Sequence, residues 1–148
     1  MEQSRIEKHV DLKSPPSRVW KALTDHKEFG QWFGCTMEGP FVLGKTTRGK
    51  LTYPGFEHLQ LAVNVKEMRA EHLFSFTWHP YAIDPAVDYE QEVPTLVEFR
   101  LETAGSGTHL VVTESGFEKL PANRRLEAFR MNEEGWIEQL ENIAQYVG

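Results

Sequence analysis

The chain of 148 residues carries 22 acidic and 16 basic side chains, so its formal net charge at pH 7 is −6. Proteins that bind nucleic acids concentrate Lys and Arg on one face, so this charge argues against a nucleic-acid partner. Cys35 is the only cysteine, which excludes an internal disulfide and any metal site built from several cysteines. We expect a single domain over residues 1–148 with one core, in which Cys35 is a small buried or half-buried apolar side chain.

The start of the chain and its hydropathy indicate a cytoplasmic protein. No apolar run follows residues 1–5, which argues against a signal peptide, and no later stretch is long enough to span a bilayer. We therefore expect a cytoplasmic location and no membrane span.

The first predicted strand covers residues 6–12, where apolar and polar side chains alternate. A helix is expected next, because Ser14 precedes two prolines, an arrangement typical of a helix N-cap. Asp25 can cap a second, shorter helix that ends near Gly30. Just outside this second helix the sequence places an aromatic cluster of Phe29, Trp32 and Phe33.

Beyond Gly34 apolar residues recur at every second position, which is the period of a half-buried strand. The alternation predicts strands around residues 59–65, 74–78, 97–102 and 110–112, with shorter ones at 35–38 and 46–53. The turn Gly105-Ser106-Gly107 predicts that the last two strands form a hairpin.

Two further segments complete the predicted layout. Residues 79–91 form the least regular stretch and are expected to be a long acidic loop. Residues 123–147 are predicted to form one long amphipathic helix, and Glu133 falls near the centre of its apolar arc. The order of strand, two helices, about six mostly antiparallel strands and a final helix indicates an α+β fold.

The pattern resembles the helix-grip proteins of the START/polyketide-cyclase/Bet v-like (SRPBCC) superfamily, and within it the homologues of the activator of the heat-shock chaperone ATPase. The resemblance covers nearly the whole chain and is carried by Pro16, Val19, Trp20, Leu23, Thr24, Asp25, Trp32, Phe33, Phe41, Gly44, Leu73, Phe76, Trp78, Thr108, Leu110, the run from Thr113 to Phe117, Gly135 and Trp136. One departure is Lys45, where the family often has a second glycine. The resemblance implies a β-α-α-β(6)-α fold in which a curved antiparallel sheet grips the C-terminal helix, with a cavity between them. Related families bind small apolar or amphipathic molecules.

Ligand pockets are lined mainly by aromatic and apolar side chains with a few polar groups. Eight residues are candidate ligand-binding residues because the predicted sheet or helix would point them inward: Trp32, Phe33, Tyr53, Phe76, Trp78, Phe129, Glu133 and Trp136. Core packing is the alternative explanation for the aromatic residues. For Glu133 the alternative is a structural hydrogen bond or an ion pair at the edge of the apolar stripe, with His79, Arg48 and Tyr53 as possible partners.

No motif in the sequence indicates catalysis, a metal or a cofactor. The six histidines occur singly, and the chain has neither a Gly-x-Ser-x-Gly nucleophile elbow nor a phosphate-binding loop. The leading hypothesis is therefore binding of a small hydrophobic or amphipathic molecule between the sheet and the C-terminal helix. One alternative is an interaction module for a chaperone, which the resemblance implies. Another is a cyclase- or hydrolase-type enzyme in which Glu133 acts as general acid or base.

Overall fold

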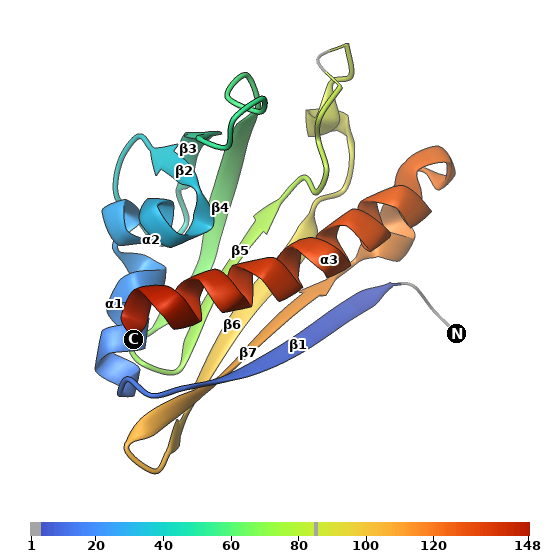
Figure 1. Cartoon of the computed structure of the whole chain (residues 1–148). Helices are drawn as coiled ribbons and strands as arrows, with labels where there is room; N and C mark the ends of the chain where they lie inside the picture. Colours follow the sequence, from blue (N-terminus) through green and yellow to red (C-terminus); the bar gives the residue numbers. More distant parts are fainter. Residues whose placement is uncertain (1–3, 85) are drawn as a thin grey trace.

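A seven-stranded antiparallel sheet, crossed on one face by a long helix, organises the chain in the computed structural model (Figure 1). The structure describes residues 4–84 and 86–148. In chain order the strands and helices are β1 (Arg5–Leu12), α1 (Pro16–Thr24), α2 (His26–Phe33), β2 (Cys35–Met37), β3 (Thr46–Leu51), β4 (Gln60–Arg69), β5 (Leu73–Trp78), β6 (Thr95–Ala104), β7 (Gly107–Ser115) and α3 (Ala122–Val147). Two short 3₁₀ helices, η1 (Tyr89–Gln91) and η2 (Phe117–Lys119), precede β6 and α3. The predicted α+β order of elements is confirmed.

The strands lie in the order β1-β7-β6-β5-β4-β3-β2, and each neighbouring pair is antiparallel. Ala104 pairs with Gly107, so Gly105 and Ser106 form the turn of the predicted β6–β7 hairpin. α3 runs diagonally across one face of the sheet, and α1 and α2 lie beside its C-terminal end (Figure 1). This arrangement confirms the helix-grip fold that the resemblance implied.

The core lies between the inner face of the sheet and α3. Strands β5, β6 and β7 contribute the buried side chains of Phe74, Phe76, Val97, Phe99, Leu101, Leu110 and Val112. Phe99 and Trp136 show how the two layers interlock, with ring centroids 5.6 Å apart and planes at 81°. Complete burial of such a side chain contributes about 1.5–3 kcal/mol to folding. The apolar face of α3 therefore fixes the helix on the sheet.

The capping of α1 differs from the prediction. Pro15 occupies the N-cap position, and α1 begins at Pro16 without a side-chain cap. Ser14 Oγ donates a hydrogen bond to the carbonyl oxygen of Val147 at 2.5 Å, so this hydroxyl joins the loop after β1 to the end of α3. Ser14 has the sequence position of an N-cap residue, but its hydroxyl bonds to Val147 of α3 instead of to an amide of α1.

The capping of α2 follows the prediction at its start and departs from it at its end. Asp25 accepts hydrogen bonds from the backbone amides of Lys27 and Glu28 at 2.9 and 3.1 Å, which confirms it as the N-cap. The helix continues past Gly30 to Phe33, so the aromatic cluster lies within α2 rather than outside it. Gly30 is required for packing, because a Cβ there would lie 2.3 Å from the carbonyl oxygen of Cys35.

Among the described residues, no helix combines the length and the hydropathy that a membrane span requires. The cytoplasmic location stays a prediction. Residues 1–3, on which the argument about a signal peptide partly depends, lie outside the described residues.

Candidate functional site

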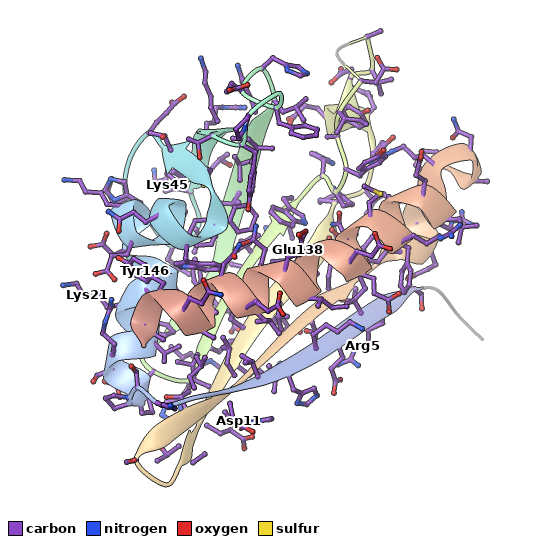
Figure 2. The ribbon with its side chains drawn as sticks, in the orientation of Figure 1. Arg5, Asp11, Lys21, Lys45, Glu138 and Tyr146 are labelled. Carbon is purple, nitrogen blue, oxygen red and sulfur yellow. The ribbon has the colours of Figure 1, made fainter. Side chains whose placement is uncertain are left out.

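A groove of about 530 Å³ opens along one flank of α3. Its walls come from α2, from the segment between Leu51 and Leu61, from the loop after β5, and from residues 131–139 of α3. Several large side chains at the groove are exposed: Tyr53, Phe56, Ile83 and Met131. Glu138 lies on the same flank of α3, on the side away from β1 (Figure 2). The apolar walls are therefore accessible from solvent.

A smaller recess of about 100 Å³ adjoins the groove, and we call it the aromatic recess. It is lined by Phe33, Trp78, Asn132, Gly135, Trp136 and Gln139, and all of these except Trp136 also line the groove. The indole rings of Trp78 and Trp136 are nearly parallel, with centroids 5.8 Å apart. Phe33 lies edge-on to both, at 6.0 Å from Trp78 and 6.3 Å from Trp136. Three of the six residues that line the recess are therefore aromatic.

A fully buried carboxylate lies behind two of these rings. Glu114, at the end of β7, is 0% exposed. Its Oε1 accepts hydrogen bonds from Trp136 Nε1 and Asn132 Nδ2, both at 2.9 Å. Its Oε2 accepts from Trp78 Nε1 at 2.8 Å and from Thr95 Oγ1 at 2.5 Å. Neutral donors from β5, β6 and α3 therefore converge on one carboxyl group.

The donors around Glu114 determine how its carboxyl group is bonded. An indole N–H and an amide NH₂ can only donate, so both oxygens of the carboxyl group must accept. Among the residues that the structure describes, no Lys or Arg pairs with this side chain. Burial of an ion without such hydrogen bonds is strongly unfavourable. The four donors thus stabilise Glu114, and Glu114 in turn fixes the orientation of Trp78 and Trp136.

The structure brings four of the eight candidate residues to this site. Phe33, Tyr53 and Trp78 line the groove, and Trp136 lines the aromatic recess. The hydroxyl of Tyr53 donates to the carbonyl oxygen of Phe33 at 3.1 Å, which holds the exposed ring at the mouth of the groove.

Three other candidates lie in the core rather than in the groove. Trp32 is buried and its Nε1 donates to the carbonyl oxygen of Ala22 at 2.8 Å. Phe76 has no exposed surface. Phe129 packs edge-on against Phe117 with centroids 5.2 Å apart. For these rings the core-packing explanation applies.

Glu133 lies on the other flank of α3. Its side chain is 43% exposed, and its Oε2 is 3.4 Å from Lys8 Nζ on β1. The ion-pair explanation describes this geometry, but the partner is Lys8 rather than His79, Arg48 or Tyr53. The sequence predicts Glu133 near the centre of the apolar arc of α3, but the structure places it at the edge of the buried face, beside Lys8 of β1. The structure therefore does not bring Glu133 to the groove.

The buried carboxylate Glu114 was missed in the sequence analysis, although a signal for it was present. Leu110 and Val112 alternate on the inner face of β7, and continuing the same period places Glu114 on that face. Asn132 and Thr95 were missed as well, because their role depends on the spatial position of Glu114.

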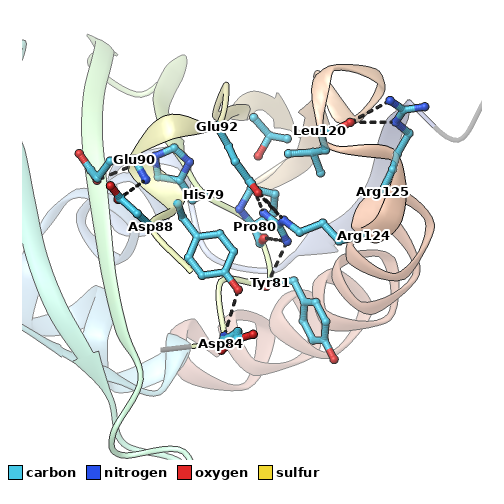
Figure 3. Close-up of polar contacts among 12 residues, drawn as sticks. His79, Pro80, Tyr81, Asp84, Asp88, Glu90, Glu92, Leu120, Arg124 and Arg125 are labelled. Atoms are coloured by element: carbon cyan, nitrogen blue, oxygen red, sulfur yellow. Dashed lines mark hydrogen bonds and ion pairs between the residues drawn. The ribbon is translucent and has the colours of Figure 1, made fainter. Parts of the chain in front are cut away.

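The loop after β5 forms one side of the groove and is held by Arg124 of α3 (Figure 3). Arg124 donates from Nη2 to Glu92 Oε1 at 2.6 Å and from Nη1 to the carbonyl oxygens of Pro80 and Tyr81 at 2.9 and 3.2 Å. Its guanidinium also lies over the ring of Tyr89, 4.8 Å from the centroid. Tyr81 has a φ of 52°, a conformation that a non-glycine residue keeps only where its surroundings impose it. Arg124 therefore determines the shape of this wall.

His79 begins the same loop and lines both the groove and a second hollow of about 420 Å³ that shares part of the groove's lining. Its Nε2 is 3.9 Å from Glu90 Oε2, and its buried Nδ1 has no hydrogen-bond partner within the described part of the chain. Residues 4–84 and 86–148 contain no group of three or more His, Cys, Asp or Glu side chains arranged to hold a metal ion. Burial raises the pKa of the Cys35 thiol to about 12, so this thiol is not a reactive nucleophile near neutral pH.

The family model for Activator of Hsp90 ATPase homolog 1-like proteins matches residues 13–148. The chain belongs to this family. The match confirms the resemblance that the sequence pattern indicated. A search of curated proteins found no significant match.

Solved structures similar to this member of the activator-homologue family share its fold. DynU16, described as a putative protein in the dynemicin biosynthetic locus, is 21% identical with a TM-score of 0.73, over 97% of this chain and 46% of that one. MLL2253 from Mesorhizobium loti is 22% identical with a TM-score of 0.75, over 96% and 95% of the two chains. The Aha1 dimer from Colwellia psychrerythraea is 17% identical with a TM-score of 0.72, over 97% and 95%. The chain thus spans less than half of DynU16 and nearly all of the other two.

The departure from the activator-homologue pattern at Lys45 is accommodated by an open turn. Gly44 has a φ of 78°, and no heavy atom lies within 4 Å of the position that its Cβ would occupy. The carbonyl oxygen of Lys45 accepts a hydrogen bond from the backbone amide of Val65 at 3.0 Å, and its side chain is exposed. Because the Lys45 side chain is exposed at this turn, a second glycine is not required there.

Proposed function

We propose that the groove along α3 binds a small hydrophobic or amphipathic molecule. The observation that carries this proposal is an accessible groove of about 530 Å³ with apolar walls and an aromatic recess beside it. Ligand sites in proteins are concave, mainly apolar and on the order of 300–1,000 Å³. Membership of the activator-homologue family is consistent with the proposal but names no ligand.

The position of Gly135 supports this proposal. Glycine in the interior of a helix costs about 1 kcal/mol relative to alanine. No heavy atom lies within 4 Å of the position that its Cβ would occupy, so close packing does not explain the glycine. Gly135 lines both the groove and the aromatic recess, so a side chain there would project into the space proposed for the ligand.

A thermal-shift screen against apolar and amphipathic metabolites tests the proposal, because a ligand selective for the folded state raises the melting temperature. The variant Gly135→Leu provides the matched comparison, since it fills the groove without removing a core side chain. We expect compounds that raise the melting temperature of the wild type to lose this effect in Gly135→Leu. The absence of any stabilising compound, or equal stabilisation of both proteins, would contradict the proposal.

A second candidate function is docking on a chaperone, which family membership favours. The exposed apolar residues at the groove, Tyr53, Phe56 and Met131 among them, could also contact a protein. Measurement of the chaperone ATPase rate with and without the protein tests this candidate. Stimulation that is lost in a Phe56→Ser variant would support docking through this surface, and an unchanged ATPase rate would contradict it.

The acid–base role considered for Glu133 receives no support from the geometry. The carboxylate pairs with Lys8 and lies outside the groove, so it is not near a substrate bound there. We therefore assign no catalytic residue.

A further inference from the structure

The three rings of the aromatic recess are arranged to attract a positive charge. Trp78, Trp136 and Phe33 line it and pack against one another, with centroid separations of 5.8–6.3 Å. A cation within about 6 Å of an aromatic face is attracted by the negative potential of that face, and tryptophan is the most effective ring. A space of about 100 Å³ suits a compact head group rather than a fused ring system.

The carboxylate of Glu114 strengthens this attraction. Both indole N–H groups donate to it, at 2.8 Å from Trp78 and 2.9 Å from Trp136. Hydrogen bonds polarise one another in a poorly solvated interior, so donation to an anion increases the electron density of the donating rings. The hydrogen-bond partners of Glu114 are all neutral, so among the described residues no Lys or Arg brings a positive charge to this side of the aromatic recess.

The groove outside the aromatic recess carries the same sign of charge. Its described lining contains Glu134 and Glu138 but neither Lys nor Arg. That described lining also contains one histidine, His79. The whole chain has a formal charge of −6. An anionic head group, such as a carboxylate or a phosphate, would be repelled along the entire groove.

We infer that the ligand is a cationic amphiphile, whose methylated ammonium head enters the aromatic recess while its apolar tail lies in the groove. This inference rests on the proposed function, because it requires that the groove binds a small molecule. A methylated ammonium fits better than a primary amine, since it has few or no N–H donors to satisfy and presents methyl groups to the three rings.

Two matched probes test the inference: hexanoylcholine and 3,3-dimethylbutyl hexanoate, in which carbon replaces the ammonium nitrogen. Their dissociation constants are measured by tryptophan fluorescence or calorimetry. We expect hexanoylcholine to bind the wild type about tenfold more tightly than the neutral ester, the effect of a cation–π contact in a partly desolvated site. Equal affinity for the two esters would overturn the inference and leave the proposed function intact, whereas no binding of either would overturn both.

The variant Phe33→Leu separates the aromatic recess from the overall charge. It removes one ring but keeps the net charge of the chain, so any long-range attraction of the cation is unchanged. We expect the preference for hexanoylcholine to fall to about threefold or less, because one of the three ring faces is lost. Gly135→Leu provides a second variant with an intact core, and it should weaken both esters. An undiminished preference in Phe33→Leu, or unchanged affinity in Gly135→Leu, would overturn the placement of the head group.

Discussion

The side chain of Glu114 combines complete burial with four neutral hydrogen-bond donors. Hydrogen bonds to a charged group are roughly twice as strong as those between neutral groups. They also hold two indole rings that border the proposed ligand space. One residue thus links the stability of the core to the shape of the aromatic recess.

Replacement of Glu114 by glutamine tests this link. The variant has nearly the same volume, but an NH₂ group replaces one acceptor and faces groups that also donate. We expect a loss of about 2–4 kcal/mol in the free energy of unfolding, measured with urea. The matched control is Glu133→Gln, whose exposed ion pair with Lys8 should cost about 0.5 kcal/mol or less. A loss of similar size in both variants would contradict the assignment.

Cys35 gives a prediction for alkaline pH. Burial raises the pKa of its thiol from an ordinary value near 9 to about 12, so the folded protein keeps this proton when the unfolded chain has lost it. The stabilisation is complete below pH 9 and falls by about 1.4 kcal/mol per pH unit as the pH rises from 9 towards 12. We expect the stability difference between wild type and Cys35→Ala to shrink over pH 9–11. A difference independent of pH would contradict the raised pKa.

The two glutamates show what sequence periodicity can predict about a site. Strand alternation places Glu114 on the inner face of β7 from its neighbours alone. The helical arc predicts Glu133 near its centre, whereas the side chain is 43% exposed at the edge of the buried face, where it pairs with Lys8 of β1. The polarity of a position depends on the partner that the fold supplies, and this partner is 125 residues away in the sequence.

At the scale of elements, three sides of α3 make three different kinds of contact. One face packs on the sheet, one flank forms an ion pair with β1, and the other flank borders the groove. Gly135 belongs to the groove flank, where no atom restricts a side chain. The helix therefore tolerates a glycine that its own stability does not favour.

The variant Gly135→Ala should raise the free energy of unfolding by about 0.5–1 kcal/mol, because alanine restricts the unfolded chain and has a higher helix propensity. Chemical denaturation measures the change. Gly30→Ala is the opposite case and should destabilise the protein, since its Cβ would overlap the carbonyl oxygen of Cys35. Destabilisation by Gly135→Ala would show that the space beside the helix is not open.

The loop after β5 depends on Arg124. The variant Arg124→Lys keeps the charge but loses the bidentate geometry with Glu92 and the bonds to two loop carbonyls. We expect faster hydrogen exchange at the hydrogen-bonded loop amides of Asp84, Val87 and Glu92, with a loss of about 1–2 kcal/mol in stability. Arg125→Lys is the control, because within residues 4–84 and 86–148 the Arg125 side chain bonds only to the Leu120 carbonyl of its own segment. Equal exchange rates in the two variants would contradict the role of Arg124.

Sequence patterns at helix starts predicted the capping residue correctly where that residue bonds within its own helix. Asp25 caps α2 because its side chain reaches the amides of the next residues. Ser14 lies before a helix in the same way, yet its hydroxyl bonds to Val147 at the other end of the chain. Capping patterns thus predict where a helix starts more reliably than which side chain caps it.

At the scale of the whole molecule, a curved sheet holds α3 across one face and leaves space beside one flank of the helix (Figure 1). The alternation of the strands and the resemblance predicted this architecture. The position of the groove could not be predicted, because it depends on where the loops after β3 and β5 lie relative to α3. Trp32, Phe76 and Phe129 therefore fill the core, while Phe33, Trp78 and Trp136 reach the aromatic recess.

The four tryptophan indole N–H groups allow the most direct test of ligand binding in the groove. In ¹H–¹⁵N spectra, titration with hexanoylcholine and with its neutral isostere should shift the indole signals of Trp78 and Trp136. The signals of Trp20, in α1, and of Trp32, which donates to Ala22, should stay unchanged. Four unchanged signals with both esters at saturating concentration, or shifts confined to Trp20 and Trp32, would contradict a ligand site in this groove.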